Sequence, residues 1–116
     1  MSCLELDDDA CRKIAEPMMD DTLDGIARCD YVHHTRHFSV ALKSALTSDA
    51  FLADCESRRA DWGTPGPREL VCIFRKPKSF TLVWDQGFER ADGQIMAALT
   101  IALKGGRYFI DHFQLH

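Results

Sequence analysis

Residues 95–115, IMAALTIALKGGRYFIDHFQL, determine the fold more than any other part of the chain. Two apolar runs, Ile95–Leu103 and Tyr108–Leu115, stand on either side of Gly105-Gly106. Two glycines between such runs are a strong signal for a tight β-hairpin, because both positions of the favoured turn need positive φ. The C-terminal part of the chain is therefore predicted to be two antiparallel strands.

Two further strands are predicted upstream of this hairpin. Apolar and polar residues alternate from Phe80 to Asp85, and an apolar run covers Leu70–Phe74. Residues 75–78 and Asp92-Gly93 have the composition of turns. Four consecutive strands joined by short turns predict an antiparallel meander.

The first half of the chain is predicted to be helical. From Ala10 to Cys29 the apolar residues recur at steps of three and four, the period of an amphipathic helix, with Asp9 as the expected N-cap. Pro17 removes one backbone hydrogen bond, so we expect it to bend this helix or delay its start. A short helix is expected over Tyr31–Phe38, continued or restarted up to residue 46.

A last helix is predicted from Thr47, which is a suitable N-cap. Its buried apolar stripe is predicted to contain Phe51, Leu52 and Cys55, with Trp62 as a further candidate. Glycine and proline at residues 63–67 end this helix. Helices followed by strands indicate the α+β class. We expect N-terminal helices packed on a curved four-stranded antiparallel sheet, in a single domain over residues 1–116.

The predicted strand Ile95–Leu103 contains one polar residue, Thr100. An antiparallel strand with one solvated face normally alternates apolar and polar residues, so this strand is expected to be covered on both faces. The helices cover one face. A second copy of the chain is predicted to cover the other, which makes the protein a homodimer through the outer sheet face.

Composition favours a cytoplasmic protein. The net charge of −4 divides into −6 over residues 1–30 and +2 over the rest, without the basic face that nucleic-acid-binding proteins use. No apolar run is long enough to cross a membrane, and the N-terminus is acidic where a secretory signal is basic. Five scattered cysteines without a CxxC motif are typical of reduced thiols. We therefore expect neither a nucleic-acid partner nor a membrane partner.

The order of these elements resembles the nuclear transport factor 2-like superfamily, the cone-shaped α+β fold that includes ketosteroid isomerase and SnoaL-type cyclases. The stretches that carry the resemblance are DYVHHTRHF at residues 30–38, LTSDAF at 46–51 and GGRYFIDHFQLH at 105–116. The chain is most similar to small bacterial members without assigned function. The resemblance implies a curved sheet around a helix, an apolar cavity, and dimerisation through the outer sheet face.

A histidine-rich stretch raises the question of a metal site. On a continuous helix, Cys29, His33 and His37 lie at i, i+4 and i+8, and all three are possible zinc ligands. Three ligands in one row, spread over about 12 Å of helix, cannot surround one ion. We therefore predict no metal site and no cofactor, and we interpret the histidines as polar cover at a helix junction.

Acid–base catalysis is one alternative. Ketosteroid isomerase-like members use a carboxylate in the cavity, assisted by tyrosine or by a protonated acid. By position, Asp30, Tyr31 and His34 are candidates for the cavity mouth, and Asp85 is a candidate for its interior. Alternatively, these residues have structural roles only. Asp30 is then the N-cap of the short helix, and His34 is a partly exposed polar residue.

The favoured function is noncatalytic: a dimeric module that binds a small apolar ligand, or a protein partner, around an apolar pocket. Its predicted lining residues are Tyr31, His34, Phe38, Phe51, Trp84 and Phe113. The aromatic residues among them also suit an ordinary core. Two alternatives remain open. One is a lyase, isomerase or hydrolase of the ketosteroid isomerase type, and the other is an immunity-type protein whose acidic first helix neutralises a basic partner.

Overall fold

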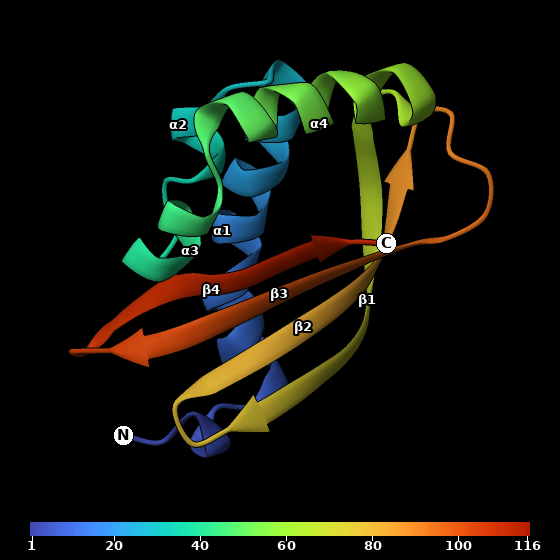
Figure 1. Cartoon of the computed structure of the whole chain (residues 1–116). Coiled ribbons are helices and arrows are strands. Elements are labelled where there is room, and N and C mark those ends of the chain that lie inside the picture. Colours follow the sequence, from blue (N-terminus) through green and yellow to red (C-terminus); the bar gives the residue numbers. More distant parts are fainter.

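The computed structural model describes residues 1–116 and contains four α-helices and a four-stranded sheet. Figure 1 shows how these elements are arranged. The elements in chain order are a 3-10 turn η1 (Cys3–Glu5), helices α1 (Asp8–Arg28), α2 (Tyr31–His34), α3 (Val40–Ala45) and α4 (Ser48–Trp62), and strands β1 (Pro65–Lys76), β2 (Ser79–Phe88), β3 (Ile95–Lys104) and β4 (Arg107–Leu115). All helices precede all strands, and the strand order β1-β2-β3-β4 is an antiparallel meander. The predicted α+β class is confirmed.

Helix α1 begins earlier than expected. Its N-cap is Asp7 and not Asp9, because the Asp7 carboxylate accepts a hydrogen bond from the Ala10 backbone N–H at 2.8 Å. Asp8 and Asp9 occupy the first turn, where negative charge suits the positive end of the helix dipole. Pro17 lies on the exposed side inside α1 and neither delays the start of the helix nor divides it (Figure 1).

Helix α1 ends in a left-handed turn. Cys29 is the only non-glycine residue with positive φ, at 51°, and its backbone N–H donates to the Gly25 and Ile26 carbonyl oxygens. Such a turn commonly ends a helix, but glycine is the usual residue there. Gly25 lies directly against the backbone of His34, so α1 and α2 touch through their main chains at this point.

Helix α2 is shorter than the predicted helix over Tyr31–Phe38, because it ends at His34. The chain then runs in an extended form beside β4, where Phe38 and Ile110 form a parallel bridge. The Ile110 backbone N–H donates to the His37 carbonyl oxygen at 2.7 Å, and the Ser39 N–H donates to the Ile110 carbonyl oxygen at 2.8 Å. Ser39 then caps α3, so the predicted restart is present.

The sheet begins at Pro65, earlier than the predicted Leu70. Pro65 and Pro67 fit within β1 because it is an edge strand, where a missing N–H does not interrupt the ladder. The predicted β3–β4 hairpin is present. Gly105 and Gly106 have φ of 58° and 76°, the positive values that its two-residue turn requires.

The hydrophobic core lies between α1 and one face of the sheet. Phe80, Leu82 and Trp84 alternate along β2, are almost completely buried, and belong to one core cluster with Met19 of α1. Thr81, Val83 and Asp85 occupy the intervening positions and are half-buried. We call the face that packs on α1 the inner face and the opposite one the outer face.

The expected cover on both faces of β3 is only partly observed. On its outer face, Ala98 and Ala102 are 9% and 6% exposed, whereas Met96 is 39% exposed. The alanines are small and pair with the larger Val83 and Phe109 of the neighbouring strands. Their burial within a single chain therefore needs no second copy. None of the helices has the length and apolar character needed to cross a membrane.

Candidate functional site

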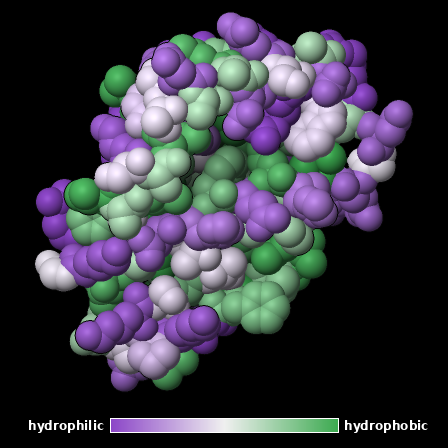
Figure 2. All heavy atoms as spheres, in the orientation of Figure 1, coloured by the Kyte–Doolittle hydropathy of each residue, from purple (hydrophilic) through white to green (hydrophobic).

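An apolar pocket of about 330 Å³ opens between α3, α4 and the end of β4. Figure 2 shows it as a green hollow between α4 and β4. Thirteen residues line the pocket and nine of them are hydrophobic. Helix α4 crosses above the end of the sheet (Figure 1). It buries Phe51 and Cys55, both of which line the pocket, whereas Leu52 of the predicted stripe is 36% exposed.

His34 forms the polar centre of the pocket wall. It is 4% exposed, so the expectation of a partly exposed side chain is wrong. Its ring stacks on Phe51 with centroids 4.7 Å apart, and it meets the rings of Phe38 and Phe113 edge-on at 5.2 and 5.5 Å. Its Nδ1 lies 2.8 Å from the Thr22 carbonyl oxygen. A carbonyl oxygen only accepts hydrogen bonds, so Nδ1 carries the proton.

The His34 ring is neutral near physiological pH. Burial lowers its pKa from the ordinary value of 6.5, and the positive charge of Arg58 acts in the same direction. The hydrogen bond to Thr22 opposes this shift but is the smaller effect. With the proton on Nδ1, Nε2 is a hydrogen-bond acceptor, and no group of the protein donates to it.

Four of the six predicted lining residues line this pocket: His34, Phe38, Phe51 and Phe113. Tyr31 and Trp84 do not. Tyr31 lies behind Phe51, with ring centroids 5.9 Å apart, and its hydroxyl donates to the Leu46 carbonyl oxygen at 2.7 Å. Tyr31 therefore ties α2 to the connection between α3 and α4.

Trp84 belongs to the core beneath α1. It is 1% exposed, and the guanidinium of Arg68 lies 5.5 Å from its ring centroid. The arginine is held there by Glu16 of α1, whose carboxylate accepts from two of its nitrogens at 3.0 and 3.1 Å. The prediction that Trp84 lines the cavity is wrong, because the pocket lies beyond β3 at the opposite edge of the sheet.

The two candidate catalytic carboxylates lie outside the pocket. Asp30 is the N-cap of α2 and accepts a hydrogen bond from the His33 backbone N–H at 3.1 Å. Asp85 was expected inside the cavity, but it lies on the outer face because Trp84 beside it points inward. It accepts a hydrogen bond from the Gln94 side chain at 2.8 Å. Neither carboxylate therefore meets the imidazole in the pocket.

Three lining residues of α4 were missed in the sequence: Asp54, Cys55 and Arg58. They follow Phe51 by three, four and seven residues, which places them on the same face of the helix. The Arg58 guanidinium lies 5.6 Å from the Trp62 ring centroid. Neither Asp54 nor Arg58 forms an ion pair within the chain, so no opposite charge of the protein neutralises either of them at the pocket.

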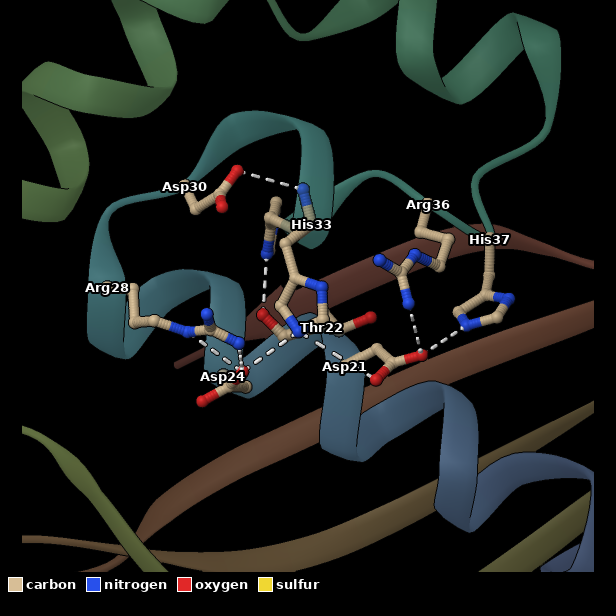
Figure 3. Close-up of polar contacts among 9 residues, drawn as sticks. Asp21, Thr22, Asp24, Arg28, Asp30, His33, Arg36 and His37 are labelled. Atoms are coloured by element: carbon tan, nitrogen blue, oxygen red, sulfur yellow. Dashed lines mark hydrogen bonds and ion pairs between the residues drawn. The ribbon is translucent and has the colours of Figure 1, made fainter.

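The remaining histidines of the stretch contact the acidic face of α1 (Figure 3). His33 Nε2 lies 2.9 Å from Asp24 Oδ2, and His37 Nε2 lies 2.7 Å from Asp21 Oδ2. The hypothetical row with Cys29 does not exist, because α2 ends before His37. No group of three or more histidine, cysteine or acidic side chains in the chain is placed to hold a metal ion.

The acidic residues of α1 also pair with two arginines of β1. Arg68 contacts Glu16 at 3.0 Å and Asp20 at 2.8 Å, and Arg75 pairs with Asp8 near the start of the helix. Much of the negative charge of the first helix is therefore balanced within the chain. This weakens the argument that the helix attracts a basic partner.

Solved structures of other proteins are similar to this chain in fold. The sequence matches no protein-family model and no curated protein. In structure, the chain is similar to RPA3114, a SEC-C motif containing protein from Rhodopseudomonas palustris, with a TM-score of 0.58 and 13% identity over 84% of this chain and 74% of that one. It is also similar to Bd1075 of Bdellovibrio bacteriovorus, with a TM-score of 0.53 and 7% identity over 90% of this chain and 39% of that one. At these identities the likeness extends to the fold alone.

Proposed function

We propose that this protein is a noncatalytic module that binds a small, mostly apolar molecule in the pocket between α3, α4 and β4. The observation that carries the proposal is the neutral imidazole of His34, enclosed by three aromatic rings in the wall of an open pocket. A volume of about 330 Å³ is at the lower end for ligand sites and suits a compact, bicyclic molecule.

The free acceptor on His34 specifies the polar group of the ligand. With Nδ1 bound to the Thr22 carbonyl oxygen, Nε2 is left to accept a hydrogen bond. A ligand hydroxyl is the simplest donor of the right polarity. One such hydrogen bond contributes about 0.5–1.5 kcal/mol, or up to about tenfold in affinity.

The nuclear transport factor 2-like superfamily and its cone-like curvature remain part of this proposal. A pocket between N-terminal helices and an antiparallel meander supports it. The homodimer is proposed through the outer face, where Phe74 and Met96 are 63% and 39% exposed. Large exposed apolar side chains on one sheet face favour an interface, with a second copy or with another protein. The cytoplasmic location also belongs to the proposal, and five free cysteines support it.

The two alternatives have less support. The acid–base mechanism was based on Asp30 and Asp85, and neither lies in the pocket. The immunity-type function was based on the acidic first helix, whose carboxylates form ion pairs with Arg68 and Arg75 and contact the nearby histidines.

Native mass spectrometry of untagged protein, purified without metal-affinity resin, tests the assembly and any retained ligand in one spectrum. We expect a dimer, and a bound small organic molecule adds a discrete mass to it. A monomer at micromolar concentration would contradict the proposed outer-face interface. It would leave the pocket proposal intact, because all lining residues come from one chain.

Calorimetric titration with 2-naphthol and naphthalene tests the pocket itself. We expect the alcohol to bind about tenfold more tightly, because it alone can donate to His34. Ala45→Trp should abolish binding, since Ala45 is an exposed residue of α3 that lines the pocket. Ala41→Trp is the matched control, because Ala41 is an exposed alanine of the same helix outside the lining. Equal affinities for the two probes, or unchanged binding by Ala45→Trp, would contradict the proposal.

A further inference from the structure

Two cysteines meet where the end of α1 touches α4. Cys55 is 1% exposed and lines the pocket, whereas Cys29 is half-buried at the C-terminal end of α1. Their sulfur atoms lie 2.7 Å apart, although 26 positions separate them in the sequence. The Cys55 thiol also lies 2.9 Å from the Ile26 carbonyl oxygen, which fixes its position. Both thiols are free.

The other cysteines are arranged differently. Cys11 has Cys3 and Arg75 nearby, but Cys3 and Cys11 are both completely buried. Cys3 and Cys11 are buried at the opposite end of the molecule, where the Cys3 backbone N–H donates to the Pro77 carbonyl oxygen of the β1–β2 turn. Cys72 pairs with Val83 on the outer face. The contact between Cys29 and Cys55 is therefore the single thiol–thiol contact within hydrogen-bonding distance in the chain.

The two thiols have different surroundings. Cys29 is half-buried, and Arg59 Nη1 lies 3.7 Å from its sulfur, so this thiol is reached from solvent and has a guanidinium beside it. Burial and the neighbouring Cys29 raise the pKa of Cys55, so this thiol keeps its proton. Cys29 also has the only positive φ outside glycine, a conformation in which any side chain costs stability. These differences make Cys29 the attacking residue and Cys55 the resolving one.

We propose that Cys29 and Cys55 are a reversible redox site that reacts with a hydroperoxide. The Cys29 thiolate attacks the terminal oxygen, the O–O bond breaks, and an S–O bond forms. The departing alkoxide, or hydroxide from hydrogen peroxide, takes a proton from water. The Cys55 sulfur then attacks the Cys29 sulfenic acid, and the hydroxyl group leaves with the Cys55 proton as water. Two thiols lose two electrons to the peroxide, and a dithiol reductant restores them by exchange.

The geometry requires little movement for the second step. A disulfide bond is about 2.05 Å long, so the sulfurs need to approach by less than about 1 Å. The product would join the end of α1 covalently to α4, the helix that forms one wall of the pocket. The proposal does not depend on ligand binding, because it rests on the two thiols and Arg59 alone.

Peptide mapping of the whole protein tests this site. Fully reduced protein is treated with one equivalent of hydrogen peroxide, quenched with N-ethylmaleimide and digested without reductant. We expect a cross-linked peptide that contains Cys29 and Cys55, and its loss after treatment with dithiothreitol. Cys72 is the internal control, since it is similarly half-buried but has no thiol partner. We expect Cys29 to react about tenfold faster than Cys72.

Variants separate the two roles. Cys55→Ser should leave a sulfenic acid on Cys29 that dimedone captures, whereas Cys29→Ser should leave Cys55 unmodified. Arg59→Gln should slow the first step, with Arg12→Gln as the control, because Arg12 is an exposed arginine near the opposite end of α1. Absence of the cross-linked peptide in the wild-type protein, or oxidation of Cys72 as fast as Cys29, overturns the proposal. The wild-type map does not depend on whether the variants fold.

Discussion

Replacing Gly25 with alanine tests the contact between α1 and α2. In the interior of a helix, alanine is about 1 kcal/mol more favourable than glycine, so helix propensity alone predicts a more stable protein. The structure predicts the opposite. A Cβ atom at position 25 would lie 2.4 Å from the backbone nitrogen of His34, 2.5 Å from its Cα and 2.6 Å from its Cβ.

The expected loss of stability in Gly25→Ala depends on which atoms of His34 the new Cβ atom would meet. Two of the three belong to the main chain of α2, so the clash cannot be relieved by rotating a side chain and α2 has to move as a unit. Overpacking of this kind costs about 1–3 kcal/mol, and a main-chain clash belongs at the upper end. After the gain in propensity, we expect Gly25→Ala to lower the free energy of unfolding by about 2 kcal/mol. For a chain of this size, that lowers Tm on the order of 8 °C.

Urea unfolding followed by circular dichroism measures the free energy, and scanning calorimetry measures Tm. Lys13→Ala and Lys13→Gly are the matched controls, because Lys13 is exposed in the same helix. The alanine variant of that pair should be about 1 kcal/mol more stable than the glycine variant. If Gly25→Ala is as stable as the wild type while the control pair behaves normally, the close approach of α1 and α2 is refuted.

Three further predictions concern the residues around this contact. The pKa of His34 is lower in the folded chain than in the unfolded chain, so the unfolded chain binds the proton more readily. The free energy of unfolding should therefore decrease as the pH falls below about 6.5. Urea unfolding at pH 7.5 and at pH 5.5 should show a smaller decrease for His34→Gln than for the wild type. Tyr31→Phe removes the hydrogen bond to the Leu46 carbonyl oxygen and should cost about 1 kcal/mol in urea unfolding, and an unchanged midpoint would show that this bond contributes nothing. Asp30→Ala removes the cap of α2 and should cost about 1 kcal/mol, whereas Asp85→Ala on the outer face should stay within about 0.5 kcal/mol of the wild type.

The strands were predictable because their signals are local. Alternation from Phe80 to Trp84 and the glycine pair before Arg107 depend only on neighbouring residues. The end of α2 was not predictable in this way. The chain leaves the helix after His34 and pairs with Ile110, a partner that lies more than seventy positions away in the sequence. Nothing in the local pattern of the histidine stretch signals that distant contact.

The candidate site was predictable in part. The outer-face position of Asp85 could have been predicted from the sequence, because the alternation that buries Trp84 places Asp85 on the opposite face. The burial of His34 could not be predicted from the local sequence, because it depends on the close approach of α2 to α1 at Gly25, which has no side chain. A histidine flanked by polar residues has the same local pattern whether it is exposed or enclosed by aromatic rings.

The extended residues at positions 37–39 also affect how copies of this protein can meet. An open strand edge is a template on which another molecule can extend a sheet. Here the backbone of residues 37–39 pairs with Ile110 in the middle of the outer edge of β4, and the edge of β1 carries Pro65, Pro67 and an irregularity near Val71. Both edges of the sheet therefore carry features that hinder pairing with an added strand. Aggregation by edge pairing is disfavoured, and association of copies is expected through faces of the molecule.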